Sequence, residues 1–128
     1  MSGLMIAEQD RSCRDMMADL LSEEGYIVTV TNSAADALSG ILKKSAQVVL
    51  LGSGFDDLAA TELIPLLKQC NRNLTIILVS DGESPPAMRN IRDAGIFYHA
   101  LKPANPEDAE EIRDVVKCAF ENISHHVH

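Results

Sequence analysis

The fold follows from the stretch Val48-Val49-Leu50-Leu51-Gly52-Ser53-Gly54. An unbroken apolar run that ends in a glycine-rich turn predicts a strand buried on both faces, as in a parallel sheet covered by helices. Ligands and chemistry gather at the carboxyl ends of such strands. Gly52 therefore stands at a position typical of functional side chains and has no side chain itself.

Outward from this strand, the whole chain alternates between two patterns. Short apolar or β-branched runs predict strands at 4–7, 26–31, 48–51, 74–79 and 96–101. Apolar residues at helical spacing predict five helices. The first begins at Arg11 and stops at Gly25, the second begins after a cap at Ser33, and the third covers 61–70. The fourth begins at Pro85-Pro86 and stops at Gly95, and the fifth begins at Pro106. This alternation predicts an α/β fold: a doubly wound, five-stranded parallel sheet in a flavodoxin-like sandwich.

The helical spacing also predicts which residues are buried. The helix after Ser33 is expected to bury Ala34, Ala37, Leu38, Ile41 and Leu42, and the helix over 61–70 to bury Leu63, Leu66 and Leu67. The cysteines are odd in number and lie far apart in apolar patterns, which favours buried thiols over disulfides or a metal site. They are Cys13, Cys70 and Cys118.

Length and charge limit the classes of function. The 128 residues fit one domain, predicted over 1–122, followed by a frayed tail at 123–128 whose histidines are expected to be disordered rather than metal-bound. A net charge of −8 argues against binding nucleic acid or an anionic membrane surface. No secretory signal or membrane-length apolar segment is found, which favours a cytoplasmic protein.

Several features together carry a resemblance from residue 4 to about 120. They are the order of elements, Glu8-Gln9-Asp10 after the first strand, Ser80 after the fourth, Lys102-Pro103 after the fifth, and Ala34-Ala35-Asp36-Ala37-Leu38. This pattern resembles the receiver domain of two-component response regulators. The resemblance implies an aspartate at the end of the third strand that takes a phosphoryl group from a histidine kinase, near a divalent cation and a lysine. It also implies a hydroxyl and an aromatic residue that relay this event to the surface made by helix four, strand five and helix five.

The acceptor position of this pattern falls on Gly52, so the nucleophile is absent and no catalytic residue is predicted. The metal-binding positions fall on Glu8 and Gln9; a longer acid and a neutral amide suit the octahedral geometry of Mg²⁺ poorly. We therefore expect no cofactor and no tightly held metal. Glu8 is left with two readings, a ligand role or an ion pair with Lys102, whereas Asp10 is expected to cap the first helix rather than bind metal.

Other candidates belong to the same pocket. Asp56 and Asp57 are expected to be solvated loop carboxylates, with a displaced acceptor as the weaker reading. The resemblance allows a cis bond between Lys102 and Pro103. Ser80 stands at the switch hydroxyl, where a backbone-bonding role is equally open, and His99 stands at the aromatic switch position, expected as a partly buried neutral ring.

Two classes of function follow. The first is a pseudo-receiver, not an enzyme, that contacts a kinase or output domain, or a second copy through the helix four, strand five and helix five surface, without aspartyl phosphate. The second is a flavodoxin-like binder of a small anionic ligand, held by 52–54, Ser80 and Lys102. Residual phosphotransfer at Asp56 or Asp57 is a weaker third reading.

Overall fold

A computed structural model describes residues 3–44, 46–52, 54–55, 58–80 and 95–126. Its centre is a five-stranded sheet in the order β2-β1-β3-β4-β5, in which every pair of neighbours is parallel. The strands are β1 (Gly3–Ala7), β2 (Ile27–Thr31), β3 (Val48–Gly52), β4 (Thr75–Ser80) and β5 (Ile96–Leu101). The doubly wound α/β prediction is confirmed.

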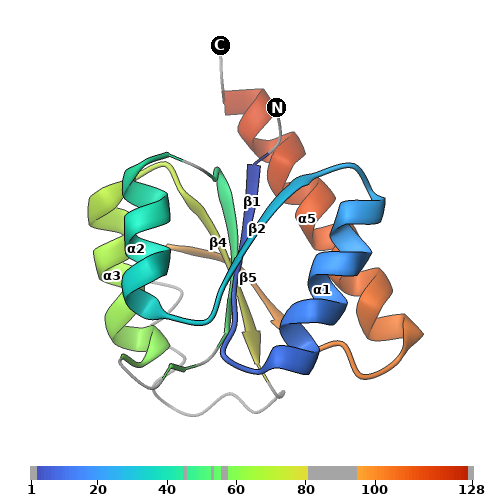
Figure 1. Cartoon of the computed structure of the whole chain (residues 1–128). Coiled ribbons are helices and arrows are strands. Elements are labelled where there is room, and N and C mark those ends of the chain that lie inside the picture. The colour runs from blue at the N-terminus through green and yellow to red at the C-terminus, as the bar shows by residue number, and fades with distance from the viewer. Residues whose placement is uncertain (1–2, 45, 53, 56–57, 81–94, 127–128) are drawn as a thin grey trace.

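Helices cover both faces of the sheet. They are α1 (Arg11–Glu23), α2 (Ala34–Leu42), α3 (Ala60–Cys70) and α5 (Pro106–His126). Figure 1 shows α1 and α5 on one side of the sheet and α2 and α3 on the other. The helix predicted from Pro85-Pro86 lies outside the described residues. All strands run the same way, so their carboxyl ends meet at one edge, opposite the end where β1 begins and α5 finishes (Figure 1).

Strand β3 is apolar throughout because it contributes to two cores. Val49 and Leu51 pack into the cluster under α2 and α3, whereas Val48 and Leu50 pack into the cluster under α1 and α5. Side chains of a strand alternate between the two faces of a sheet, and here both faces are covered. The continuous apolar run is thus explained by burial on both sides.

Strand β2 is poorly covered. Its Ile27 and Val30 are both about half exposed. The strand lies at the edge of the sheet and pairs with β1 alone. An edge position leaves fewer neighbours to bury β-branched side chains, and sequence alternation does not report on sheet order.

Helix ends follow local chemistry. The Asp10 side chain accepts a hydrogen bond from the Cys13 amide at the start of α1, and Ser33 accepts one from the Asp36 amide at the start of α2. Gly25 adopts a φ of 95° just after α1, where a residue with a β-carbon would be strained. The predicted caps are confirmed.

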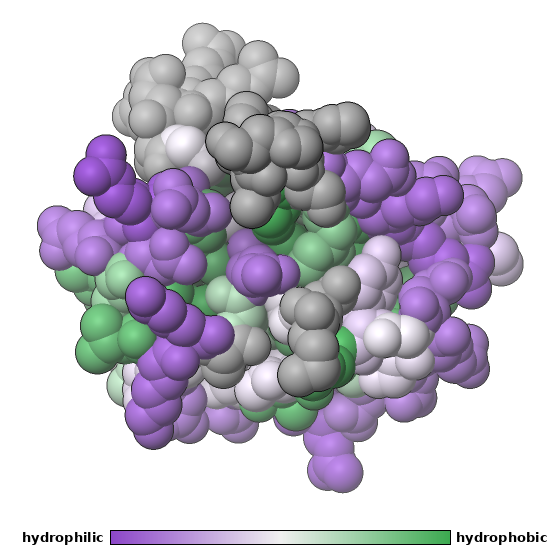
Figure 2. Space-filling model, turned by 90° about the horizontal axis from the view of Figure 1, so that it is seen from above, coloured by the Kyte–Doolittle hydropathy of each residue, from purple (hydrophilic) through white to green (hydrophobic). Residues whose placement is uncertain are grey.

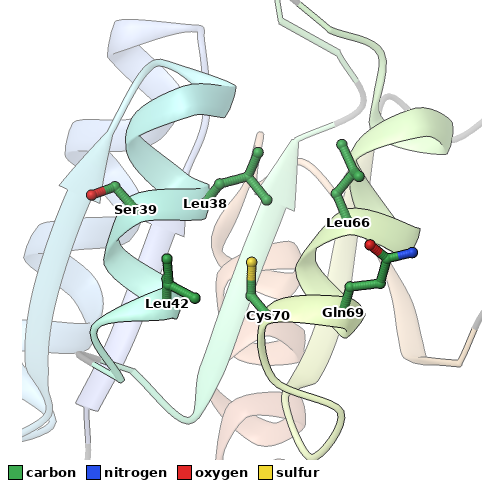
Figure 3. A pocket seen from close by; sticks show the side chains of 6 residues that line it. All are labelled: Leu38, Ser39, Leu42, Leu66, Gln69 and Cys70. Atoms are coloured by element: carbon green, nitrogen blue, oxygen red, sulfur yellow. The ribbon is translucent and has the colours of Figure 1, made fainter.

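Two predicted core residues face an open groove instead. Leu42 is 65% exposed and Leu66 is 38% exposed, so their predicted burial is wrong. The groove lies between α2 and α3, has a volume of about 400 Å³, and is lined by Leu38, Ser39, Leu42, Leu66, Gln69 and Cys70. Figure 3 shows its leucines on the facing sides of the two helices. Helical periodicity gives the direction of an apolar stripe but not how far the neighbouring elements cover it.

The carboxyl-terminal segment also differs from the prediction. Helix α5 continues to His126, so much of 123–128 is helical rather than frayed. Ile123 still packs against the core cluster under α1 and α5, which supports the helix beyond residue 122. Of the cysteines, Cys13 is buried as predicted, Cys70 is half-buried, and Cys118 is exposed because it falls outside the buried stripe of α5.

Figure 2 shows the molecule from above the view of Figure 1, with mostly hydrophilic side chains around its rim and smaller apolar areas between them. Among the described residues, no helix is long and apolar enough to span a bilayer.

Candidate functional site

The predicted site residues converge at the carboxyl edge of the sheet. Glu8 follows β1, Gly52 ends β3, Ser80 ends β4 and Lys102 follows β5. The register places Gly52 opposite Val79 and Ser80 opposite Leu101. The parallel topology therefore brings together residues that are up to about ninety positions apart in the chain.

Glu8 is the buried charge of this site. Only 2% of the residue is exposed, and its Oε1 lies 3.8 Å from Lys102 Nζ. Its Oε2 accepts a hydrogen bond of 3.1 Å from the Asp10 amide. A buried carboxylate is costly unless it is paired and hydrogen-bonded. Glu8 is paired with Lys102 and hydrogen-bonded through Oε2, whereas its buried Oε1 accepts no hydrogen bond from the described residues. The predicted ion pair between Glu8 and Lys102 is present, and a ligand role for Glu8 stays a prediction.

Gly52 lies directly against the Glu8 carboxylate. A β-carbon added at residue 52 would come within 2.8 Å of Oε1 and 2.9 Å of Oε2 and Cδ. Its φ lies outside the left-handed region that favours glycine. The backbone of β3 therefore allows a side chain at residue 52, and the Glu8 carboxylate occupies the space for it.

The loop between β1 and α1 holds Glu8 in place. Arg14 Nη1 donates hydrogen bonds to the carbonyl oxygens of Glu8, at 2.9 Å, and Gln9, at 3.3 Å. Asp10 uses its side chain to cap α1, as predicted, and Gln9 is exposed. Arg14 was not predicted as a site residue. An arginine in the first turn of a helix is a common feature of sequences, so it does not by itself indicate a contact with the preceding loop.

The described residues do not fit a Mg²⁺ site. Glu8 is paired with Lys102, Asp10 accepts the Cys13 amide, and Gln9 offers a neutral amide in place of a carboxylate. Among the described residues no group of three or more His, Cys, Asp and Glu could hold a metal ion. Asp56 and Asp57 lie outside the described residues, so their predicted role in the loop stays a prediction.

Ser80 and His99 are brought together at the far side of the site. Ser80 Oγ is hydrogen-bonded to His99 Nε2, which joins the end of β4 to β5. Ser80 is buried and His99 is half-buried, in line with the predicted partly buried ring. The link between β4 and β5 is extended by a 2.8 Å hydrogen bond from the Lys102 amide to the Ser80 carbonyl.

The bond between Lys102 and Pro103 is trans, since no cis peptide bond occurs among the described residues. The allowance for a cis bond is therefore wrong. It rested on the resemblance alone, because the sequence of an X-Pro pair does not fix its isomer. Pro103 is buried beside the site.

Cys13 shows the electrostatic character of the pocket. Burial, followed by the negative charge of Glu8, raises the pKa of the Cys13 thiol to about 11, while Lys102 acts in the opposite direction. A thiol with such a pKa carries almost no thiolate at neutral pH, so Cys13 is not a nucleophile there. A buried thiol at residue 13 was predicted, but its place beside Glu8 was not.

Comparisons with known proteins bear on this arrangement. Residues 4–116 match the model of the response regulator receiver domain. The chain is 24% identical over 117 residues to the DNA-binding transcriptional regulator NtrC of Bradyrhizobium sp. (strain RP501 Parasponia), covering 91% of this chain and 24% of that regulator. The chain thus spans about a quarter of that relative's length.

Solved receiver structures share the fold. A CheY-like receiver domain protein from Methanospirillum hungatei JF-1 gives a TM-score of 0.81 at 23% identity, over 95% of this chain and 98% of the other. The beryllofluoride-activated NtrC4 receiver domain dimer gives 0.85 at 20% identity, also over 95% and 98%. With the family model matching most of its length and the site residues gathered at the carboxyl edge of a five-stranded parallel sheet, this chain belongs to the response regulator receiver domain family.

Proposed function

We propose that this receiver domain acts in two-component signalling by protein–protein contact that does not require aspartyl phosphate. The observation that carries the proposal is the contact between Gly52 and Glu8. The resemblance puts the acceptor at residue 52, where there is no carboxylate to attack phosphorus and where a buried, already paired carboxylate fills the space.

The electrostatics support the same proposal. In phosphoryl transfer, cations neutralise the negative charge that develops on the phosphoryl oxygens. Lys102 is already 3.8 Å from Glu8, and the residue after Glu8 is an exposed glutamine. An incoming phosphoryl group would thus have to compete with the Glu8 carboxylate for the charge of Lys102. The same pairing disfavours the alternative of a small anionic ligand at Lys102, because the ligand would have to compete with the Glu8 carboxylate.

The partner is proposed to be a kinase or output domain, or a second copy of this chain. Phe97, Tyr98 and Leu101 on β5 are large apolar or aromatic side chains that are each about two-fifths exposed. Glu111 of α5 fixes this edge, since it accepts hydrogen bonds from the Tyr98 hydroxyl and the Leu101 amide. Clusters of exposed aromatic residues are typical of interfaces, and the NtrC4 receiver named above is itself a dimer.

The test is an intact mass spectrum after incubation with Mg²⁺ and acetyl phosphate. We expect no added phosphoryl mass. An acid-stable, base-labile adduct mapped to Asp56, Asp57 or another carboxylate would overturn the proposal and return phosphorylation to the mechanism. The same samples are run by size-exclusion chromatography with light scattering, where we expect the oligomeric state to be unchanged by acetyl phosphate.

A matched pair of variants tests the β5 surface. Tyr98→Ala removes an exposed aromatic side chain from this surface, whereas Met16→Ala removes an exposed apolar side chain from α1. We expect only the first to weaken self-association or binding to a cognate kinase. Equal behaviour of the two variants would place the interface elsewhere.

A further inference from the structure

We propose that Glu8 is a built-in occupant of the acceptor position: its carboxylate takes the space of a side chain at residue 52 and balances the charge of Lys102, which closes the site. The proposal that Glu8 closes the site rests on the proposed function, because it explains why the domain would act without phosphoryl transfer. The coupling between residues 8 and 52 does not depend on that function and is tested separately.

The first step is steric. The nearest atoms to a β-carbon at residue 52 all belong to the Glu8 carboxylate, at 2.8 to 2.9 Å, which is closer than real β-carbons approach other atoms. These atoms are the end of a flexible side chain, so an added methyl group would displace the carboxylate rather than the sheet. The cost of a side chain at residue 52 is therefore the cost of moving Glu8.

The second step is that Glu8 resists being moved. It is 2% exposed, its Oε1 pairs with Lys102, and its Oε2 accepts the Asp10 amide. Displacement would stretch both contacts in a place where water replaces them poorly. Since the φ of Gly52 makes no demand for glycine, the requirement for glycine at residue 52 comes from Glu8.

The third step is the charge. An aspartate at residue 52 would put a second carboxylate against the first in a buried setting, and like charges at such distances cannot both remain ionised without a further cation. Glutamate, one methylene longer than aspartate, reaches over Gly52. Removing that methylene withdraws the carboxylate from the space above residue 52.

A double-mutant cycle tests the coupling, read as urea unfolding of the full chain. In the native background we expect Gly52→Ala to lower the folding equilibrium constant about tenfold. In a Glu8→Ala background the methyl group fills vacated space and alanine is less costly to order than glycine, so the same change should be neutral or stabilising. A coupling of at least about fivefold supports the proposal, and a smaller one overturns it.

Two further variants keep this test decisive. Gly54→Ala is the matched control, because a β-carbon there meets no atom within 4 Å, and its effect should be the same with and without Glu8. If Glu8→Ala does not fold, Glu8→Asp replaces it under the same fivefold criterion. Rescue of an otherwise unfolded Gly52→Ala protein by either change at residue 8 also counts as coupling.

A second readout tests whether Glu8 blocks phosphorylation at residue 52 or only makes a side chain there costly for stability. Two proteins are compared by intact mass after acetyl phosphate and Mg²⁺: Gly52→Asp with Gln9→Asp, and the same pair with Glu8→Asp added. In the step sought, the carboxylate introduced at residue 52 attacks phosphorus, the new acyl phosphate bond forms, and acetate leaves with the electrons of the broken bond. We expect an adduct mapped to residue 52 only when Glu8 is shortened. Equal yields from the two proteins, zero included, overturn the closing role.

The failures are distinguishable. A phosphoryl adduct on the unmodified chain contradicts the proposed function and leaves the cycle to decide on Glu8 and Gly52. Absence of coupling in the cycle contradicts the inference while the unmodified chain can still act without phosphate.

Discussion

At the scale of single residues, Tyr26, which lies between α1 and β2, contacts α5 through its aromatic ring. Its ring stacks on Phe120 of α5 with centroids 5.0 Å apart. Burial raises the pKa of the Tyr26 phenol above its ordinary value, and the charges of Glu24 and Glu121 add to this. The folded state thus favours the neutral phenol over the phenolate.

This gives a prediction for alkaline pH. A pKa raised on folding contributes stability that is complete below the unfolded value of about 10 and is lost as pH rises through the folded value. We expect Tyr26→Phe, which keeps the ring stack, to lose less stability than the native chain as the pH rises above about 10. Urea midpoints at each pH measure this. Parallel pH profiles of the two proteins would contradict it.

Some contacts of the site could be predicted from the sequence and others could not. The pairing of Glu8 with Lys102 could be predicted, because both follow strands whose carboxyl ends meet. The contact of Glu8 with Gly52 could not, because it depends on how far the Glu8 side chain reaches from one strand to the next. The trans bond before Pro103 and the hydrogen bond between Ser80 and His99 likewise depend on local geometry that residue types leave open.

At the scale of elements, helix α1 begins with a side-chain cap and an exposed ion pair that differ in strength. Asp10 accepts the Cys13 amide at 3.3 Å, whereas Arg11 and Asp15 form an exposed pair at 3.7 Å. We expect Asp10→Ala to cost about 1 kcal/mol of unfolding free energy. Its matched control, Asp15→Ala, should cost less than about 0.5 kcal/mol. Urea denaturation measures both, and equal costs would mean that the cap is not a major support of α1.

Element boundaries were predicted best where the chain itself marks them. The bounds of β5 and the caps at Asp10 and Ser33 are confirmed because turn and cap residues act locally. The burial of Leu42 and Leu66 was wrong because it depends on how closely α2 and α3 approach, which neither helix encodes alone.

At the scale of the whole molecule, one sheet separates two cores. Leu50 and Leu51 are adjacent in β3 and fully buried, yet each belongs to a different cluster. We expect Leu50→Ala and Leu51→Ala each to cost about 2–5 kcal/mol, with unfolding still a single transition, because both cores share the sheet. Coincident fluorescence and circular-dichroism curves in urea check this. Two separated transitions in either variant would show that the cores unfold independently.

The architecture of the whole molecule was the most predictable level. Alternating strand and helix patterns leave few topologies, and the parallel order with helices on both faces follows from them. The position of β2 at the edge was not predicted, and its exposed Ile27 and Val30 are the physical consequence.

The carboxylate of Glu8 above Gly52 has a consequence for ancestry. If Glu8 has the role proposed above, a lineage that carries this pair cannot regain an aspartate at residue 52 in one mutational step without burying two like charges against each other. Residue 8 must shorten first, and that intermediate loses a buried contact while gaining nothing at residue 52. On that proposal the two positions show sign epistasis, and a carboxylate at residue 52 is hard to regain.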